Sequence, residues 1–139
     1  MTELVAATKA LPPITPESQP YWDGCSEGQL LIQRCEACGA YQFYPRLMCT
    51  SCGNESVVWV KSSGQGKVKS YTIIRRAVSQ AYEPDVPYVV ALIELAEGPI
   101  MMSNIISVDA EMVYIGQPVS VEFEKYSEEI SVPIFRPVV

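Results

Sequence analysis

Histidine is absent from the 139-residue sequence. Without it the chain has no imidazole for a Ser–His–Asp triad, for general acid–base catalysis or for binding a metal. Basic residues are also few, since 10 Lys and Arg stand against 16 Asp and Glu, which gives a formal net charge of -6. Nucleic-acid-type binding, which neutralises many phosphates, is therefore disfavoured, although the sequence still allows a local basic patch. Both absences argue against a chain that is catalytic on its own.

Long apolar runs and a leader pattern are missing as well. The run from Tyr88 to Ile93 is far too short to span a bilayer. Residues 1–13 do not place an apolar segment after a basic one, so no secretory signal is expected. We therefore predict a cytoplasmic protein without a membrane segment, in which thiols stay reduced. The five cysteines are then expected to bind metal and not to form disulfides.

Four of the cysteines form two matched pairs. Cys35 and Cys38 are separated by ten residues from Cys49 and Cys52, and a glycine follows the second cysteine of each pair. A CxxC turn directs two sulfurs at one metal, and the glycine permits a left-handed turn that leaves backbone amides free to bond the sulfurs. The spacing predicts a closed four-sulfur site that holds one structural zinc per chain.

The cysteines also admit other interpretations. Iron takes the same four-sulfur set in rubredoxin-like sites, so both metals remain candidates, with zinc favoured by the ribbon pattern. A redox pair made by Cys35 and Cys38 needs a βαβ context that the flanking sequence does not predict. Cys25 lies outside the motif, and we expect it to be a small buried hydrophobe because no histidine is available to activate it.

Around the cysteines the sequence predicts a mainly β fold in three parts. Residues 1–29 form a lead-in and a short helix that starts near Thr15, where Pro20 weakens the first turn. Residues 30–62 form the ribbon, with strands at 30–34 and 56–61 on either side of the cysteines. Residues 63–139 form a barrel.

The barrel prediction rests on the number and spacing of strands. Runs rich in β-branched and aromatic residues, separated by turn-like segments, cover residues 66–78, 88–96, 100–107, 118–125 and 130–135. A β-sandwich usually needs about seven strands and about 100 residues. Five strands in a shorter segment favour a small barrel of the OB type.

The densest basic stretch is a candidate contact for a ligand or a partner. It contains Lys67, Lys69, Arg75 and Arg76, and strand alternation places the first three on one face with Tyr71. A solvated strand face is the plain interpretation. The functional alternative is a patch that meets a phosphate-bearing ligand, such as CoA, or an acidic partner surface.

Aromatic residues are concentrated in the first 60 residues, and Tyr21 and Trp22 are among them. A miniature ribbon core does not require so many rings. Part of this set is therefore expected to contact another protein, and we take Tyr21 and Trp22 as candidate partner contacts.

Several motifs in a fixed order make the sequence resemble the DUF35 family, from about residue 15 onward. The two cysteine pairs are accompanied by YWDG, GQLLIQRC, GQGKV, PYVVALIEL, Asn104, IGQPV and PIFRP. The resemblance implies a rubredoxin-like zinc ribbon followed by an OB-fold. It also implies a noncatalytic accessory subunit, in a hetero-oligomer with a thiolase-superfamily enzyme that acts on acyl-CoA as a thiolase, acyltransferase or aldolase.

Two alternatives to this function stay open. A single-stranded nucleic-acid-binding protein is the runner-up, because zinc ribbons and OB-folds both occur there, but the acidic net charge disfavours it. Direct binding of CoA by the basic stretch, with CoA as a ligand shared with the partner, is the third hypothesis. The identity of the acyl-CoA is not encoded in any motif that we find.

Overall fold

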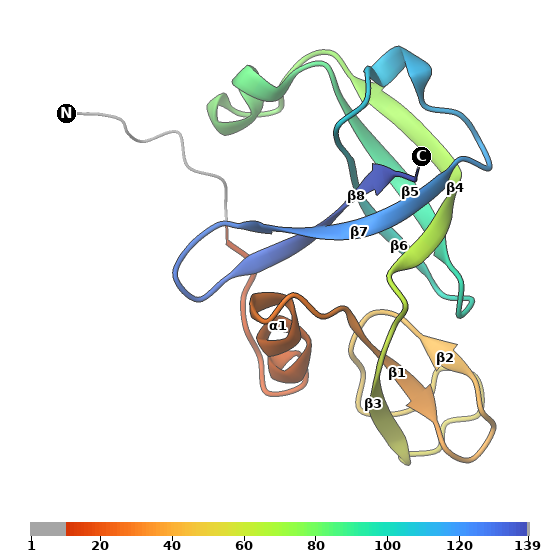
Figure 1. The fold of residues 1–139 in the computed structure, drawn as a ribbon. Coiled ribbons are helices and arrows are strands. Elements are labelled where there is room, and N and C mark those ends of the chain that lie inside the picture. Colours follow the sequence, from red (N-terminus) through yellow and green to blue (C-terminus); the bar gives the residue numbers. More distant parts are fainter. Residues whose placement is uncertain (1–10, 139) are drawn as a thin grey trace.

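The computed structural model describes residues 11–138, which form a short helix, a small sheet and a closed barrel (Figure 1). The first part contains α1 (Gln19–Ser26), β1 (Leu31–Cys35), β2 (Tyr41–Gln42) and β3 (Val57–Lys61). The barrel contains β4 (Gln65–Ile74), β5 (Tyr88–Leu95), β6 (Ile100–Ile105), β7 (Pro118–Lys125) and β8 (Ser131–Pro137). Two 3-10 helices, η2 (Gln80–Asp85) and η3 (Ala110–Met112), lie in the loops after β4 and β6. The predicted fold class is confirmed.

Helix α1 begins later than the sequence predicts. Thr15 does not cap it; instead Thr15 and Ser18 form a turn in which the Ser18 N–H donates to the Thr15 carbonyl oxygen at 3.0 Å. The helix starts at Gln19, so Pro20 falls in its first turn, where a missing N–H costs no helical hydrogen bond. Pro20 thus sets where the helix starts and does not kink it.

The small sheet is antiparallel and has the strand order β2-β1-β3. Strand β1 pairs with β3 from Leu31 opposite Lys61 to Cys35 opposite Val57. Strand β2 is only two residues long and pairs on the other edge of β1. This arrangement puts Cys35 at the end of a strand that is held on both sides.

The barrel has the strand order β4-β5-β6-β8-β7, and β7 closes it on β4. Its strands pair antiparallel except for β6 and β8, which run parallel and pair only at Ile105 and Phe135. The Ser103 hydroxyl also donates to the Pro133 carbonyl oxygen at 2.9 Å. Two long antiparallel pairs, β5–β6 and β7–β8, therefore meet at a narrow seam.

A bulge in β4 corrects the predicted alternation of the basic stretch. Val68 pairs with Ile93 and Ser70 with Leu92, so Lys69 is an extra residue on β4. One extra residue reverses the side-chain alternation beyond it. Val68 points into the barrel before the bulge and Tyr71 packs on the core after it, so Tyr71 does not share a face with Lys67 as predicted.

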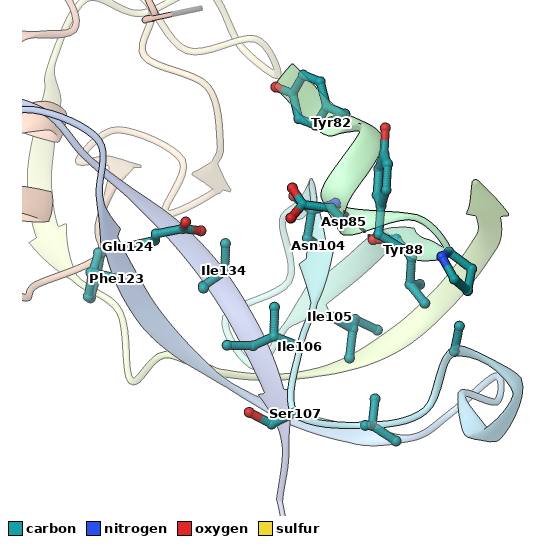
Figure 2. Close-up of a pocket in the computed structure, with 14 residues that line it drawn as sticks. Tyr82, Asp85, Tyr88, Asn104, Ile105, Ile106, Ser107, Phe123, Glu124 and Ile134 are labelled. Atoms are coloured by element: carbon teal, nitrogen blue, oxygen red, sulfur yellow. Dashed lines mark hydrogen bonds between the residues drawn. The ribbon is translucent and has the colours of Figure 1, made fainter. Parts of the chain in front are cut away.

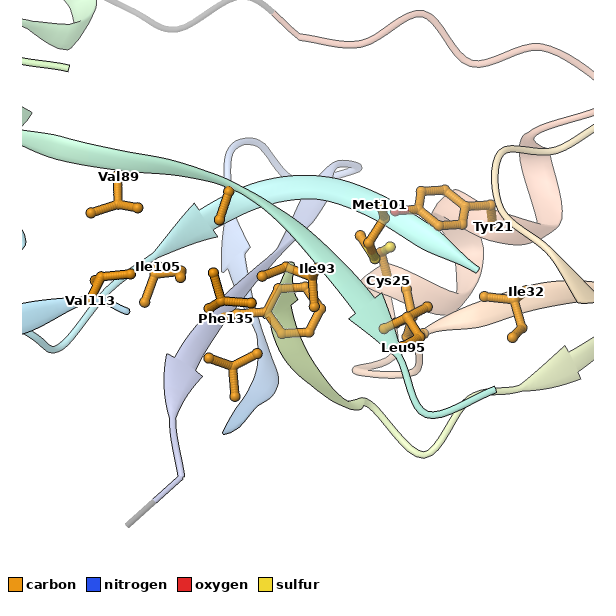
Figure 3. Packing of buried hydrophobic residues seen from close by; sticks show 14 of the residues in the cluster. Tyr21, Cys25, Ile32, Val89, Ile93, Leu95, Met101, Ile105, Val113 and Phe135 are labelled. Carbon is orange, nitrogen blue, oxygen red and sulfur yellow. The ribbon is translucent and has the colours of Figure 1, made fainter. Parts of the chain in front are cut away.

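One hydrophobic core runs from the helix into the barrel. Figure 3 shows Tyr21, Cys25 and Ile32 close to Met101 and Leu95, with the row continuing through the barrel to Val89 and Val113. At its centre Ile93 and Phe135 are fully buried. Helix α1 and strand β1 therefore belong to the same core as the barrel, although β1 is a strand of the ribbon and α1 precedes it in the sequence.

The segment that connects β3 of the ribbon to β4 of the barrel is held by hydrogen bonds to a carboxylate. Glu97, in the β5–β6 turn, accepts from the Ser62 hydroxyl and from the Ser63 backbone N–H, both at 2.8 Å. Burial raises the pKa of Glu97, but these hydrogen bonds outweigh burial and hold the pKa below its usual range. Gly64 follows with φ of 78°, and a Cβ there would lie 2.6 Å from Val121 Cγ1, so the link passes tightly over β7.

Within residues 11–138, no helix has the length and apolar character that crossing a membrane requires.

Candidate functional site

The four predicted cysteine ligands come together at the tip of the ribbon. Their Sγ atoms all lie within 4.8 Å of one another. Cys35 ends β1 and Cys38 follows in the turn before β2, while Cys49 and Cys52 occupy a second turn before β3. The second turn repeats the first: the Gly39 N–H donates to the Cys35 carbonyl oxygen at 2.8 Å, and the Gly53 N–H donates to that of Cys49 at 2.9 Å.

The spacing of the sulfurs fits a tetrahedral metal and not disulfides. The Cys35 and Cys52 Sγ atoms are 3.7 Å apart, and those of Cys38 and Cys49 are 3.6 Å apart. A disulfide needs about 2.05 Å between its sulfurs. A tetrahedron with metal–sulfur bonds of about 2.3 Å has edges of about 3.8 Å. The donor set therefore fits zinc, with all four positions filled by protein and none left for substrate.

Backbone amides prepare two of the sulfurs to be thiolates. The Cys38 N–H donates to Cys35 Sγ at 3.4 Å, and the Ser51 and Cys52 N–H groups donate to Cys49 Sγ at 3.3 and 3.5 Å. These bonds lower the pKa of Cys35, and they lower that of Cys49 to about 6. A thiolate is the form that binds a metal, so these bonds favour the binding state at Cys35 and Cys49.

Two buried glutamines, which the sequence reasoning missed, hold the segment between the cysteine pairs. Gln42 Nε2 donates to Gln33 Oε1 at 2.8 Å, and Gln33 in turn bonds both the backbone N–H and the carbonyl oxygen of Arg46 at 2.9 Å. Gln42 also donates to the Met48 carbonyl oxygen and accepts from the Thr50 N–H. The only sign of this buried pair in the sequence is that Gln33 and Gln42 each lie within a short run of apolar residues.

The segment that these glutamines hold, residues 43–48, is called the ribbon loop below. It exposes Tyr44, Leu47 and Met48, of which Leu47 is 71% exposed. The Arg46 guanidinium lies 5.8 Å from the centre of the Tyr44 ring, and no acidic residue occurs in this segment. The ribbon loop therefore presents an apolar and cationic surface on an acidic protein.

Tyr21 and Trp22, which the sequence offers as candidate partner contacts, are buried within this chain, so their contact with a partner stays a prediction. Tyr21 is 3% and Trp22 is 8% exposed. Tyr21 packs edge-on against Trp22 and Phe43, with ring centres 4.8 and 5.6 Å apart, and Phe43 packs on Tyr44. The helix rings thus support the ribbon loop from inside, because α1 is covered by the ribbon and the barrel. Of these four rings, Tyr44 is the exposed one.

The basic stretch is spread along β4 and is partly neutralised. Lys67 lies 3.8 Å from Glu94, and Arg75 pairs with Glu111 of η3. Lys69 is the bulge residue, and Arg76 follows the end of β4; both are exposed. The four residues therefore do not form one compact patch, and their proposed contact with CoA or a partner stays a prediction.

Cys25 is buried, as the sequence reasoning expected, at 1% exposure. Burial raises the pKa of its thiol to about 12. A protonated thiol inside a core is a poor nucleophile. Cys25 therefore acts as a small core residue and not as a fifth ligand.

A four-cysteine ribbon joined to a closed five-stranded barrel defines the class of the protein: a zinc-ribbon and OB-fold protein. Two family models match it in sequence order. They are described as the rubredoxin-like zinc ribbon domain of ChsH2, over residues 22–58, and the C-terminal OB-fold domain of ChsH2, over residues 59–124.

A relative of similar size places the chain in a named family. A DUF35 domain-containing scaffold protein of Methanocaldococcus jannaschii is 36% identical over 110 residues, which cover 78% of this chain and 77% of the relative. The chain belongs to the DUF35 family, which confirms the resemblance inferred from the sequence motifs.

Two further matches are a longer protein and a solved structure. A probable enoyl-CoA hydratase alpha subunit of Thermomonospora curvata is 32% identical over 133 residues; these cover 96% of this chain but only 41% of the relative. A solved structure described as the Ltp2-ChsH2(DUF35) aldolase matches with a TM-score of 0.83 and 32% identity, over 93% of this chain and all of the matched chain. The chain thus spans about two fifths of the hydratase subunit.

Proposed function

We propose that this protein is a noncatalytic accessory subunit of a thiolase-superfamily enzyme that acts on acyl-CoA. In this proposal the zinc ribbon is a rigid docking element and the barrel supports access of the acyl-CoA to the partner's active site. The reacting groups lie on the partner. The named relatives support the proposal, since they are described as a scaffold protein, as a subunit of an enoyl-CoA hydratase and as part of an aldolase with Ltp2.

The chemistry of this chain agrees with a role without catalysis. It has no histidine, four of its cysteines converge on one closed site, and Cys25 is buried with a raised pKa. A closed four-sulfur site has no open position at which a metal activates water or substrate. Four of the described acidic residues, Glu94, Glu111, Glu122 and Glu128, each pair with a basic residue.

The ribbon loop is the surface that we assign to the partner, and this assignment carries the proposal. Leu47, Met48 and Tyr44 are large apolar side chains that remain exposed although the loop beneath them is fixed by the buried glutamines. A fixed apolar surface loses little conformational entropy on binding and releases water from its side chains. The neighbouring Arg46 favours a partner surface with carboxylates at its rim.

The direct experiment is co-purification of the chain with a thiolase-fold protein, followed by assay of each protein alone and of the two together. We expect a stable complex, and acyl-CoA turnover that needs both proteins or rises at least tenfold when both are present. Leu47→Asp is expected to weaken the complex at least tenfold, since it buries a carboxylate in an apolar contact. Val78→Asp is the matched control, because Val78 is 83% exposed on the barrel, outside the ribbon loop.

Two results would contradict the proposal. Full activity of the large protein without this chain, together with no complex, removes the accessory role. Salt-sensitive binding of a single-stranded oligonucleotide in a filter assay would instead favour the nucleic-acid alternative. The basic stretch is tested in the complex by Lys69→Ala and Arg76→Ala, which we expect to raise the KM for acyl-CoA about threefold without changing assembly.

A further inference from the structure

Two cavities adjoin at the seam between β6 and β8. The larger one, the cavity on the barrel, has a volume of about 550 Å³, and Asp85 and Glu124 are among its lining residues (Figure 2). The smaller one has about 280 Å³, is lined mainly by α1, the ribbon loop, β6 and β8, and is called the seam groove below. Asn104 and Ile134 line both cavities. The seam groove is therefore the place where helix, ribbon loop and barrel meet.

Trp22 brings an unused hydrogen-bond donor to the seam groove. The residue lines the groove and is 8% exposed, and its indole Nε1–H is buried without a hydrogen-bond partner among the described residues. A buried donor without an acceptor costs free energy, and folded proteins rarely leave one in this state. The indole N–H can therefore still donate to an acceptor that is not part of the described chain.

The first half of β6 has an edge without a partner strand. Strands β6 and β8 pair only at Ile105 and Phe135, and there the Ile106 N–H donates to the Phe135 carbonyl oxygen at 2.8 Å. Residues two apart in a strand direct their backbone groups to the same edge, so those of Met102 and Asn104 also face β8. Within residues 11–138 no strand pairs with them on that side. An open strand edge is suited to an extended peptide.

Exposed apolar side chains join the seam groove to the ribbon loop. Tyr44 of the ribbon loop is 49% exposed and Met102 of β6 is 66% exposed, and both line the groove. Leu92, which pairs with Met102 across the β5–β6 hairpin, and Ile100 extend this surface over the barrel. The ribbon loop and the hairpin are thus two exposed apolar regions with the seam groove at their junction.

From the unused donor, the open edge and the apolar rim we infer that the seam groove receives an extended segment of the partner protein. An apolar side chain of this segment packs on Tyr44 and Met102, and a backbone carbonyl oxygen beside it accepts from the Trp22 indole N–H. Among the described residues that line the groove, none is a lysine or an arginine, which disfavours a phosphate-bearing ligand there. The inference rests on the proposed function and adds a second contact to that of the ribbon loop.

The indole N–H is covered in the free chain, so an acceptor reaches it only when a side chain at the rim moves. Met102 has this freedom, because its side chain is unbranched, flexible and exposed. Binding therefore exchanges an unpaired buried donor for a paired one, and it covers apolar surface at the same time.

The first test is Trp22→Phe, which removes the donor and keeps an aromatic ring. We expect the complex of the metal-loaded chain with its thiolase-fold partner to weaken about tenfold, measured as the dissociation constant by calorimetry. Trp59→Phe is the matched control, because Trp59 is half-buried on β3 and does not line the groove. Circular dichroism melting checks that both variants stay folded.

Met102→Asp tests the rim of the groove without a change in the core. The complex should weaken at least tenfold, since the new carboxylate enters an apolar contact. Met112→Asp is the matched control, because Met112 of η3 is also 66% exposed but does not line the groove. An exposed position tolerates the change, so this pair remains informative if Trp22→Phe does not fold.

The indole N–H is also followed directly by ¹⁵N NMR. The chain has two tryptophans, so its spectrum contains two indole signals, and Trp59→Phe assigns them. When the unchanged chain assembles with its partner, the Trp22 indole proton should shift downfield and exchange more slowly with solvent, as a donor does when it gains an acceptor. A packing role alone would not move this signal in that way.

The inference is wrong if folded Trp22→Phe binds the partner as tightly as the unchanged chain, if Met102→Asp binds as tightly as Met112→Asp, or if assembly leaves the Trp22 indole signal unchanged. In each of these cases the complex still forms, so the accessory role stands. Absence of any complex with a thiolase-fold protein removes the proposed function and this inference together. The two failures are therefore distinguished by whether a complex forms.

Discussion

The side chains that hold the barrel differ in kind from those that hold the ribbon. Inside the barrel, Ile93 and Phe135 are fully buried among other apolar side chains. Inside the ribbon, the buried groups include Gln33 and Gln42, which are joined by a hydrogen bond, and the tip is closed by four sulfurs. A module of about 30 residues is too small to fold on apolar burial alone. The ribbon therefore depends on directed bonds, whereas the barrel depends on apolar packing.

The two regions meet through α1 and β1, which are part of the shared core. Ile32 of β1 is buried beside Leu95 of the barrel, although its own strand continues to Cys35 at the metal site. Loss of the metal should therefore affect the tip of the ribbon most and the base of β1 least.

Replacement of Cys49 by Ser, or removal of metal with a chelator, should remove the order of residues 36–56 while the barrel stays folded. Zinc in small four-ligand modules contributes on the order of 10 kcal/mol to folding, which the ribbon cannot replace by packing. Elemental analysis should find one zinc per chain in the native protein, and NMR spectra should lose only ribbon signals. Cys25→Ala is the control that keeps the metal. Purified protein with neither zinc nor iron would falsify the assignment of the site.

Truncation of Phe135 to Ala should destabilise the barrel by about 3–5 kcal/mol, because it leaves a cavity in the centre of the core. The free energy of unfolding in urea is the measurement. Met102→Ala is the matched control, since Met102 is 66% exposed on β6, and its effect should stay below about 0.5 kcal/mol. A loss of less than about 1 kcal/mol in Phe135→Ala would show that the barrel does not depend on this packing.

Replacement of Gln42 by Ala should cost about 1–3 kcal/mol and should speed the loss of zinc to a chelator. The change removes the hydrogen bonds that Gln42 makes with Gln33, with the Met48 carbonyl oxygen and with the Thr50 N–H. The rate of zinc transfer to a coloured chelator measures the effect. Gln65→Ala is the control, because Gln65 is an exposed glutamine of the barrel that bonds Ser120. Equal transfer rates in both variants would argue against a structural role for the buried pair.

Glu97→Gln should cost about 1 kcal/mol at neutral pH, because the carboxylate accepts from Ser62 and Ser63 at the link between the two regions. The pKa of Glu97 is lower in the folded state than its usual value of 4.5. The stabilisation is therefore complete above pH 4.5 and is lost as the pH falls through the lowered folded value. Urea unfolding of both proteins between pH 7 and pH 3 measures this, with Glu129→Gln as control. A difference that does not shrink in acid would contradict the prediction.

Much of the ribbon was predictable because its determinants are local. Cys35, Cys38, Cys49 and Cys52 reach one point through two short turns, each closed by a glycine, so their spacing alone encodes the site. The barrel strands were also predictable, since runs of β-branched residues between turn-forming segments reflect backbone preferences. Helix α1 was located, but its start at Gln19 was not, because the turn of Thr15 with Ser18 competed with the expected cap.

Features that depend on neighbours distant in the sequence were not predictable. The bulge at Lys69 depends on how β4 pairs with β5, and the burial of Tyr21 and Trp22 depends on the ribbon and barrel that cover α1. Asp85 and Glu124 are far apart in the sequence, and only closure of the barrel brings them to one cavity.

The sequence by itself therefore determined the metal ligands, the order of ribbon and barrel, and the absence of imidazole chemistry, because these follow from residue identity and short spacings. The tertiary structure alone decided which aromatic side chains are exposed, which charges are paired and which residues line the cavity on the barrel. Exposure and charge pairing arise only when strands and helix pack, since each side chain's surroundings then come from residues elsewhere in the chain.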